Sequence, residues 1–482
     1  MSRKLKKLAS LLVSAVMMLA MLTPVFAQGT TDGTIAGVAI DAQGAVISGA
    51  KVTAKNAATG QTLTATTEDN GSFRFSNVPV GTYTVTIEAQ SFKTYSNPDV
   101  QVQLNRVTDI NAVLEPGAVT EVVTVTGGAA AELVETTTSQ LGKSFEDRKV
   151  IELPIGQDAN QLALLSPNVV TNGSGVLGAG GSVGGNRPRN NSFTLDGIDN
   201  NDVSVTGPQI SPITDAIKEF TILTNQFSAE FGHSSAGQFN TITKSGTNEF
   251  HGDVWWYNIN KFFRSLDHRF IENEAAQGRN GDEVRRPRDD FNRLGGDFGG
   301  PVVKDKLFFF GAYQYQTRGQ AGTTQSFGAP TAAGFSRLAS LPGVSPFVLN
   351  LLRTHVPAAP AADGSVEVFG ADIPTGQIVV LVPDFLNLHQ FHINIDYNHS
   401  DKDRMYGRYF DDRFRSPLTG VPGPEFTGSV VLDNNLFSFT EIHNFSSTLI
   451  NEFRVGYRRQ IFDFAVPNTF DTFPGEFPNI SV

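Results

Sequence analysis

Apolar and polar side chains alternate along the C-terminal half of the chain. In residues 389–398, Phe391, Ile393 and Ile395 are apolar, whereas the residues between them are polar. A repeat of two residues is typical of a β-strand with one apolar face. Residues 449–458 show the same pattern, and residues 307–315 show it less cleanly. Residues 249–482 contain about seven such segments of roughly ten residues, the length with which a tilted strand crosses a bilayer. The pattern therefore predicts a transmembrane β-barrel.

The connections between these segments alternate in length. Outer-membrane barrels have short periplasmic turns and long outer loops. The alternation therefore favours such a barrel over the alternative, a soluble β-sandwich protein. The short links are residues 301–306, 400–403 and 446–448, and the long links are residues 260–289, 318–388 and 415–435.

The first residues of the chain have the order of an export signal. Basic residues within positions 3–7 precede an apolar run over residues 8–22, and a site with small residues follows. This order predicts a secretory signal peptide, residues 1–27, that is cleaved between Ala27 and Gln28. The alternative is a membrane anchor, which needs a continuous apolar stretch of about 20 residues. The sequence contains no such stretch.

Composition narrows the classes of function. The net charge of −11 argues against a nucleic-acid partner. The chain has no cysteine, so each exported domain must be stabilised by its own core rather than by disulfides. There are 37 Phe residues and 2 Trp residues, and in a barrel such rings face lipid or form interfacial girdles. The fold class that follows is mainly β.

Residues 28–116 consist of short alternating runs separated by turn signals. About seven strands in this length predict a small β-sandwich. Four motifs stand out, at residues 33–38 (GTIAGV), 47–52 (ISGAKV), 67–73 (TEDNGSF) and 80–85 (VGTYTV). With these motifs the unit resembles the carboxypeptidase regulatory-like domain, which has a transthyretin-like, carbohydrate-binding-like fold. The resemblance implies an accessory domain rather than a peptidase, and it leaves glycan binding open.

Residues 117–138 hold a short β-prone segment and a polar, alanine-rich linker. The segment resembles a TonB box. In that family the box is a periplasmic strand that pairs with the sheet edge of the energy-transducing protein TonB, mainly through backbone hydrogen bonds. The alternative is that the segment is simply the last strand of the sandwich or a linker strand. The residues implied to contact TonB are Glu121, Val122, Val123, Thr124 and Val125.

Residues 139–247 carry a further ordered series of motifs. They are residues 150–154 (VIELP), 184–191 (GGNRPRNN), 193–202 (FTLDGIDNND), 217–223 (IKEFTIL), 225–232 (NQFSAEFG) and 243–252 (TKSGTNEFHG). With residues 298–310 (FGGPVVKDKLFFF) they resemble the plug domain and first barrel strands of TonB-dependent receptors of the Oar-like branch. The resemblance implies an α+β plug that fills the lumen of a barrel.

Charged residues of the expected plug are candidates for contact with the polar inner wall of the barrel. The glycine-rich stretch 173–185 suits a backbone that lies close to the barrel or to a substrate. We interpret the charged side chains as bridges between plug and barrel rather than as substrate ligands. They are Arg187, Arg189, Asp196, Asp199 and Asp202.

No catalytic, cofactor-binding or metal-binding constellation is expected. Residues 173–178 spell the dinucleotide fingerprint, but the glycines that follow do not propagate the helix that it requires. His389 and His392 lie on opposite faces of one strand, which argues against a metal site with His399. We expect these histidines to line the lumen or its periplasmic rim. Because no serine lies in a nucleophile elbow, nothing supports an enzyme.

Residues 248–482 hold the N-terminal part of the expected barrel. If about seven strands occupy this length, a 22-stranded plugged barrel would need on the order of 700 residues. A sheet edge that stays unpaired in lipid is strongly unfavourable. We therefore expect the chain to be an N-terminal fragment with a truncated barrel.

The resemblance implies an outer-membrane, TonB-dependent receptor of a Gram-negative-type bacterium. Its sandwich would lie in the periplasm, and its partners would be TonB, outer-membrane lipid and an unidentified bulky extracellular ligand. Carbohydrate and siderophore are candidates for this ligand, and a peptide is left open. The alternative is a surface structural or adhesion protein that binds carbohydrate or matrix without transport. Deletion of residues 121–127 discriminates the two, because it abolishes uptake and leaves adhesion intact.

Overall fold

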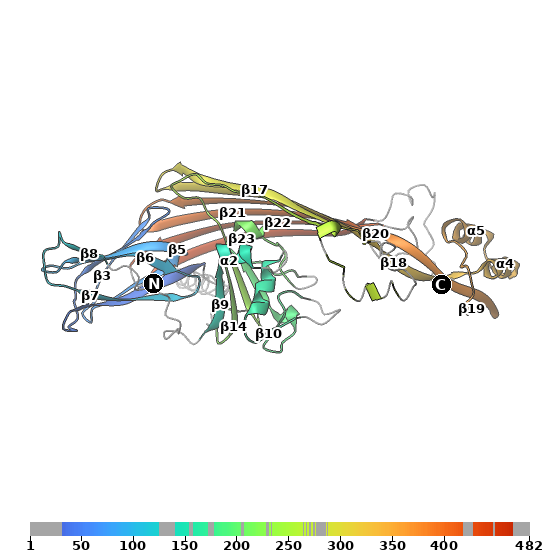
Figure 1. Ribbon diagram of the computed structural model, residues 1–482, viewed down its shortest axis with the longest axis horizontal. Helices are drawn as coiled ribbons and strands as arrows, with labels where there is room; N and C mark the ends of the chain where they lie inside the picture. Colours follow the sequence, from blue (N-terminus) through green and yellow to red (C-terminus); the bar gives the residue numbers. More distant parts are fainter. Residues whose placement is uncertain are drawn as a thin grey trace, which may run out of the picture. The chain divides into compact units, whose positions relative to one another are not determined.

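The computed structural model describes fifteen stretches of the chain, in two compact units (Figure 1). The first unit holds a β-sandwich and a second, mixed domain, and the second unit holds most of a long-stranded sheet. The predicted signal peptide, with its cleavage site at Ala27 and Gln28, lies outside the described residues. The described residues are 31–124, 140–153, 158–171, 178–203, 207–227, 231–232, 234–263, 265–266, 268, 271–272, 275, 286, 288–417, 428–446 and 449–465.

The predicted β-sandwich is confirmed. One sheet has the strand order β4-β1-β7, and the other has the order β3-β2-β5-β6-β8. The strands are β1 (Asp32–Asp41), β2 (Lys51–Asn56), β3 (Thr62–Thr66), β4 (Ser72–Pro79), β5 (Gly81–Glu88), β6 (Thr94–Val102), β7 (Val107–Leu114) and β8 (Val122–Thr124).

Alternation along the strands builds the sandwich core. In β5, Tyr83, Val85 and Ile87 are fully buried, while the threonines between them are half-buried. The same period fills the space between the sheets from β1, β2 and β7. The turn before β4 has Gly71 at φ +74°, a left-handed conformation that glycine adopts without steric cost. The turn signal at residues 69–71 therefore places β4 correctly.

Residues 140–244 form a mixed domain that we call the plug-like domain. Its main sheet has the order β13-β12-β15-β14-β9. Phe193 and Phe239 pack with ring centroids 4.8 Å apart, and Phe220 packs against Phe239 at 6.2 Å, so aromatic side chains form its centre. The elements are β9 (Leu141–Glu146), α2 (Asp147–Glu152), η1 (Ala159–Leu165), β10 (Val169–Val170), β11 (Ser182–Val183), η2 (Pro188–Asn190), β12 (Ser192–Leu195), β13 (Ile198–Asp199), η3 (Thr214–Ala216), β14 (Ile217–Asn225) and β15 (Gln238–Thr243).

The C-terminal half forms one antiparallel sheet, which we call the wall. Its strand order is β16-β17-β18-β20-β21-β22-β23, with β19 paired to β20 off this path. The wall is open, since β16 and β23 are the end strands of the order among the described residues. The elements are β16 (Val254–Asn260), η4 (Lys261–Phe263), β17 (Asp289–Val303), β18 (Leu307–Pro330), α4 (Ala332–Ser340), α5 (Pro346–His355), β19 (Gly364–Val368), β20 (Ala371–Asn398), β21 (Asp403–Pro417), β22 (Ser429–Asn444) and β23 (Ile450–Ala465).

The expected long loop at residues 318–388 is mostly not a loop. Strand β18 continues to Pro330 and β20 begins at Ala371, so the two strands form a hairpin that extends beyond the rest of the wall (Figure 1). The tip of the hairpin carries α4, α5 and β19, which pack around Phe335, Leu338 and Leu349. The prediction failed because alternation weakens in the extension, where threonine, glycine and proline are frequent. Among the described residues, no helix has the length and apolar character needed to span a membrane.

Candidate functional site

The wall has a buried face that is mostly polar and an exposed face that is mostly apolar. On β20, His392 and Asn394 have no exposed surface, whereas Ile395 is 50% exposed. A soluble sheet buries its apolar face instead. An apolar outer band with a polar interior is the arrangement of an outer-membrane barrel. The alternation in residues 389–398 therefore belongs to a strand of a barrel-type sheet with an apolar outer face, as predicted.

Polar side chains on the buried face connect neighbouring strands. The amide of Gln314 on β18 donates to Gln390 on β20 at 2.8 Å, and Gln390 donates to Asp412 on β21 at 3.4 Å. The indole N–H of Trp255 on β16 donates to Gln314 at 3.3 Å. Its ring reaches over β17 at Gly295, where a Cβ would lie 2.7 Å from the ring. We call this series the polar ladder; sequence analysis missed it because its members are far apart in the chain.

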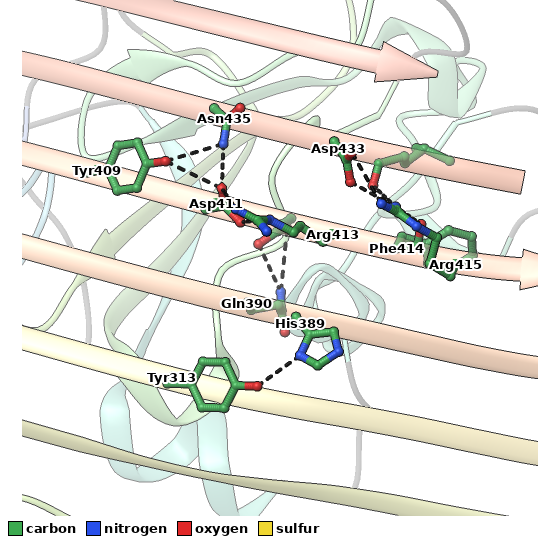
Figure 2. Close-up of polar contacts among 12 residues, drawn as sticks. Tyr313, His389, Gln390, Tyr409, Asp411, Arg413, Phe414, Arg415, Asp433 and Asn435 are labelled. Carbon is green, nitrogen blue, oxygen red and sulfur yellow. Dashed lines mark hydrogen bonds and ion pairs between the residues drawn. The ribbon is translucent and has the colours of Figure 1, made fainter. Parts of the chain in front are cut away.

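Charged side chains border the exposed apolar face at one end of β21 and β22 (Figure 2). Phe391 on β20 pairs with Asp411, so the two share a face. Asp411 accepts hydrogen bonds from Arg413 at 2.8 Å and from Asn435 at 2.6 Å. The apolar band therefore ends where paired charges begin, as expected for the boundary between lipid tails and headgroups.

The histidines of β20 divide between the two faces. His392 is fully buried on the polar face, 4.8 Å from the ring of Phe410. His389 lies on the opposite face, where its Nδ1 is 2.8 Å from the hydroxyl of Tyr313 (Figure 2). Its ring also stacks on Tyr315, with the ring centroids 4.6 Å apart. The expectation that His389 lines the lumen or its periplasmic rim is therefore wrong, because the strand period turns it to the apolar face. The expected separation of His389 from His392 is confirmed.

The segment that resembles a TonB box, which we call the box-like segment, is the end strand of the sandwich in the described residues. Val122, Val123 and Thr124 form β8 and pair in parallel with Thr94, Tyr95 and Ser96 of β6. This is the arrangement that the alternative interpretation expected, although it leaves a TonB contact open. Val125 and the linker that follows lie outside the described residues.

Contacts before β8 fasten the segment to β6. The Thr94 N–H donates to the Glu121 carbonyl at 2.8 Å, and its hydroxyl donates to the Val119 carbonyl at 2.8 Å. The ammonium of Lys93 lies 3.4 Å from Glu115 and 3.5 Å from Glu121. The hydrogen bond to Glu115 and the charges of both carboxylates raise the pKa of Lys93. Because Lys93 is on the surface, these ion pairs orient the segment more than they stabilise the domain.

Comparisons with known proteins agree with the two-faced wall. Residues 242–481 match the family model of the outer membrane beta barrel domain, and residues 34–115 match that of the carboxypeptidase regulatory-like domain. The TonB-dependent transporter Oar of Myxococcus xanthus is 32% identical over 301 residues, which are 60% of this chain and 27% of that protein. The chain is a homologue of a TonB-dependent transporter. The match thus spans about a quarter of the length of this relative.

Two solved structures resemble the chain at low identity. The outer membrane transporter YddB from Escherichia coli is 11% identical, with a TM-score of 0.45 over 66% of this chain and 38% of that one. The siderophore receptor PirA from Acinetobacter baumannii is 15% identical, with a TM-score of 0.34 over 66% and 47%. The assignment rests on the family models and on Oar. With its barrel domain, this transporter homologue is an outer-membrane protein, and its relative Oar is a TonB-dependent transporter.

The predicted contact residues of the plug-like domain lie in different surroundings. Asp196 is buried and joins β12 to β15, because its carboxylate accepts from the Thr243 N–H at 2.9 Å and from the Thr243 hydroxyl at 2.6 Å. Asp199 is exposed and accepts from the backbone N–H of Asn201 at 3.3 Å. Asp202 is buried, and its N–H donates to the Gly207 carbonyl at 2.7 Å.

Arg187 caps the short helix η2 at its N-terminus, Arg189 lies within it, and both are exposed. The structure therefore gives Asp196 a role inside its own domain of the transporter homologue. Contact of the five residues Arg187, Arg189, Asp196, Asp199 and Asp202 with the barrel interior stays a prediction. The first part of the glycine-rich stretch, residues 173–177, lies outside the described residues.

Glu219 connects the sandwich to the plug-like domain within the first unit. Its Oε1 accepts from the Leu104 N–H at 3.0 Å, and its side chain is 1% exposed. Burial raises the pKa of Glu219, and the nearby Glu146 raises it further, while bonds from Leu104, Thr221 and Ser144 oppose the rise. Sequence analysis missed this residue, although a carboxylate within the apolar run 217–223 is an available signal.

Proposed function

We propose that this transporter homologue takes a bulky extracellular ligand across the outer membrane by a TonB-driven mechanism. The observation that carries the proposal is the two-faced wall, which joins a lipid-facing apolar band to a polar interior in a chain homologous to Oar. In this mechanism TonB binds the segment Glu121, Val122, Val123, Thr124 and Val125 and pulls on it. The plug-like domain then rearranges, and no covalent chemistry takes place.

The place of β8 in the chain supports a TonB contact. It lies between the sandwich and the plug-like domain, so a force applied there acts directly on the linker to the plug-like domain. It also belongs to a sheet edge, and strand addition to an edge needs no particular side chains. Both features suit a segment through which an external protein acts on the plug-like domain.

The ligand is proposed to be a carbohydrate or a siderophore. Its candidate contact surface within this chain is the tip of the β18–β20 hairpin, which lies at the opposite end of these strands from the tight turn at residues 304–306. Phe347 and Phe369 of the tip are 67% and 72% exposed. Exposed aromatic rings suit the apolar faces of sugars and the planar groups of siderophores.

The test is a deletion of residues 121–127 in the native gene. Uptake of a ligand found by growth screening should be lost, while the amount of protein in the outer membrane and the binding of cells to carbohydrate or matrix stay unchanged. Replacement of the same residues by a glycine-serine segment of equal length controls for spacing and should lose uptake too. Uptake that survives both changes excludes the TonB contact, and loss of adhesion would favour the alternative surface protein.

A further inference from the structure

Strand β8 has a second backbone edge that the sandwich does not use. Within the described residues it stands at the end of the sheet order β3-β2-β5-β6-β8. In a parallel ladder, successive residues direct their N–H and C=O groups to opposite sides. The Glu121 carbonyl faces β6, where it accepts from Thr94. Val123 therefore also faces β6, and Val122 and Thr124 direct their backbone groups away from the sandwich.

The sandwich holds this strand in an extended conformation. The pairing runs from Thr94 opposite Val122 to Ser96 opposite Thr124. The Thr94 hydroxyl and the Lys93 ammonium bind the residues just before the strand. Val122 is 60% exposed, and within the described residues no strand pairs with the outward side of β8. A partner strand can add there without breaking any contact to β6.

We propose that the sandwich presents β8 to TonB as a pre-formed strand, and that a strand of TonB adds to the open side. This inference rests on the proposed function, because it takes the box-like segment to be the TonB contact. In the complex, β8 lies between β6 and the strand of TonB, and one continuous sheet runs from β3 into the partner. A strand that is ordered before binding loses less conformational freedom on association than a free one, so the sandwich increases the affinity for TonB.

In the alternative mechanism, the same contacts hide β8 from TonB, which we call concealment. If TonB needed the edge that β6 occupies, the sandwich would compete with TonB and lower its affinity. The two mechanisms predict opposite effects for any substitution that loosens β8 from β6. Addition at the open edge is favoured because displacement would first break the Thr94 and Lys93 bonds and the parallel ladder.

The experiment measures binding of the purified periplasmic C-terminal domain of TonB to the full chain in detergent micelles. Val122→Pro removes the outward N–H and leaves the bonds of Val123 to β6 in place. Val122→Ala is the matched control, since it shortens the same side chain and keeps the N–H. The double variant Lys93→Met and Thr94→Val loosens β8 from the sandwich side without changing the box-like segment. Hydrogen exchange at the Val123 amide reports whether β8 stays on β6 in each variant.

We expect Val122→Pro to weaken binding about tenfold or more, because a backbone hydrogen bond of the added strand is lost. Val122→Ala should stay within roughly twofold, and the double variant should bind roughly three- to tenfold more weakly. Tighter binding by the double variant would show concealment and overturn the proposal. Normal binding of TonB by the variant Val122→Pro would also overturn the proposal. If deletion of residues 121–127 leaves TonB binding intact, the proposed function itself fails; if deletion abolishes binding and Val122→Pro does not weaken it, only this inference fails.

Discussion

At the scale of single residues, Glu219 couples protonation to the packing of the sandwich against the plug-like domain. Its folded pKa is raised by burial and by Glu146, so the folded state favours the protonated acid. This contribution to stability is fully present below the ordinary pKa of a glutamic acid and is lost as the pH rises through the raised folded pKa. We expect the thermal unfolding midpoint of a fragment spanning residues 31–244 to fall across this window, measured by circular dichroism from pH 4 to pH 8.

Glu219→Gln separates charge from shape in this prediction. The amide oxygen still accepts from the Leu104 N–H, and the group no longer ionises. The variant should lose this part of the pH dependence and unfold at a higher temperature than the parent at pH 8. Glu152→Gln is the control, because Glu152 is exposed on α2 and pairs with Arg148 on the surface. If Glu219→Gln shows the same pH slope as the parent, the buried carboxylate is not the titrating group.

Gly295 makes a second prediction at this scale. A Cβ at this position would lie 2.5 Å from the Tyr313 carbonyl oxygen and 2.7 Å from the ring of Trp255. We expect Gly295→Ala to displace the indole from Gln314 and to destabilise the folded wall by about 1–3 kcal/mol, as overpacking does. The measurement is the temperature of sample heating at which the heat-modifiable band of the folded protein disappears from the gel, and this temperature should be lower for Gly295→Ala than for the parent. Gly311→Ala on β18 is the matched control, since its Cβ would have no contact closer than 3.9 Å. Equal effects of the two changes would contradict the steric argument.

At the scale of elements, alternation predicted the wall strands wherever one face meets lipid. Residues 389–398 and 449–458 were placed on strands because every second side chain is apolar. The extension of β18 and β20 was missed, since there both faces carry mixed side chains and the period disappears. The parallel pairing of β8 with β6 was open for a different reason: a segment of three β-prone residues pairs equally well with its own sandwich or with a partner. The sequence pattern of a strand indicates which of its faces is buried, but it does not identify the strand with which it pairs.

The apolar face of β20 can be tested with one charge. Ile395 lies in the middle of the apolar run between Phe391 and Tyr397. Because a charged side chain at the middle of the bilayer is costly, we expect Ile395→Arg to destabilise the inserted barrel by about 2–4 kcal/mol. The yield of folded protein in outer-membrane fractions measures this effect. Gln377→Arg places the same charge on the same strand in the extended hairpin and should leave the yield unchanged. Equal loss from both variants would show that the apolar face does not meet lipid.

At the scale of the whole molecule, the domains are stabilised in different ways. The sandwich has its own apolar core, and the plug-like domain has an aromatic one. In the wall, buried polar side chains also join neighbouring strands, with Arg408 bonded to Asp396 at 2.6 Å and Gln314 to Gln390. The wall therefore depends on a lipid environment for its apolar face, whereas the sandwich does not.

The orientation of the protein follows from the two ends of the wall strands. The tight turns at residues 304–306 and 399–402 lie at one end, and the hairpin tip with Arg337 and Arg353 lies at the other. Because outer-membrane barrels keep their short turns in the periplasm, the tip should face outward. Trypsin added to intact cells should cut after Arg337 and Arg353, whereas the sandwich should be cut only after the outer membrane is permeabilised. The variant Arg337→Gln with Arg353→Gln removes these two sites and should lose the fragments that end at Arg337 and Arg353, while cleavage in the link 260–289, which also carries basic residues, stays. Cleavage within the sandwich of intact cells would reverse this orientation and would also exclude β8 as a contact for a periplasmic protein.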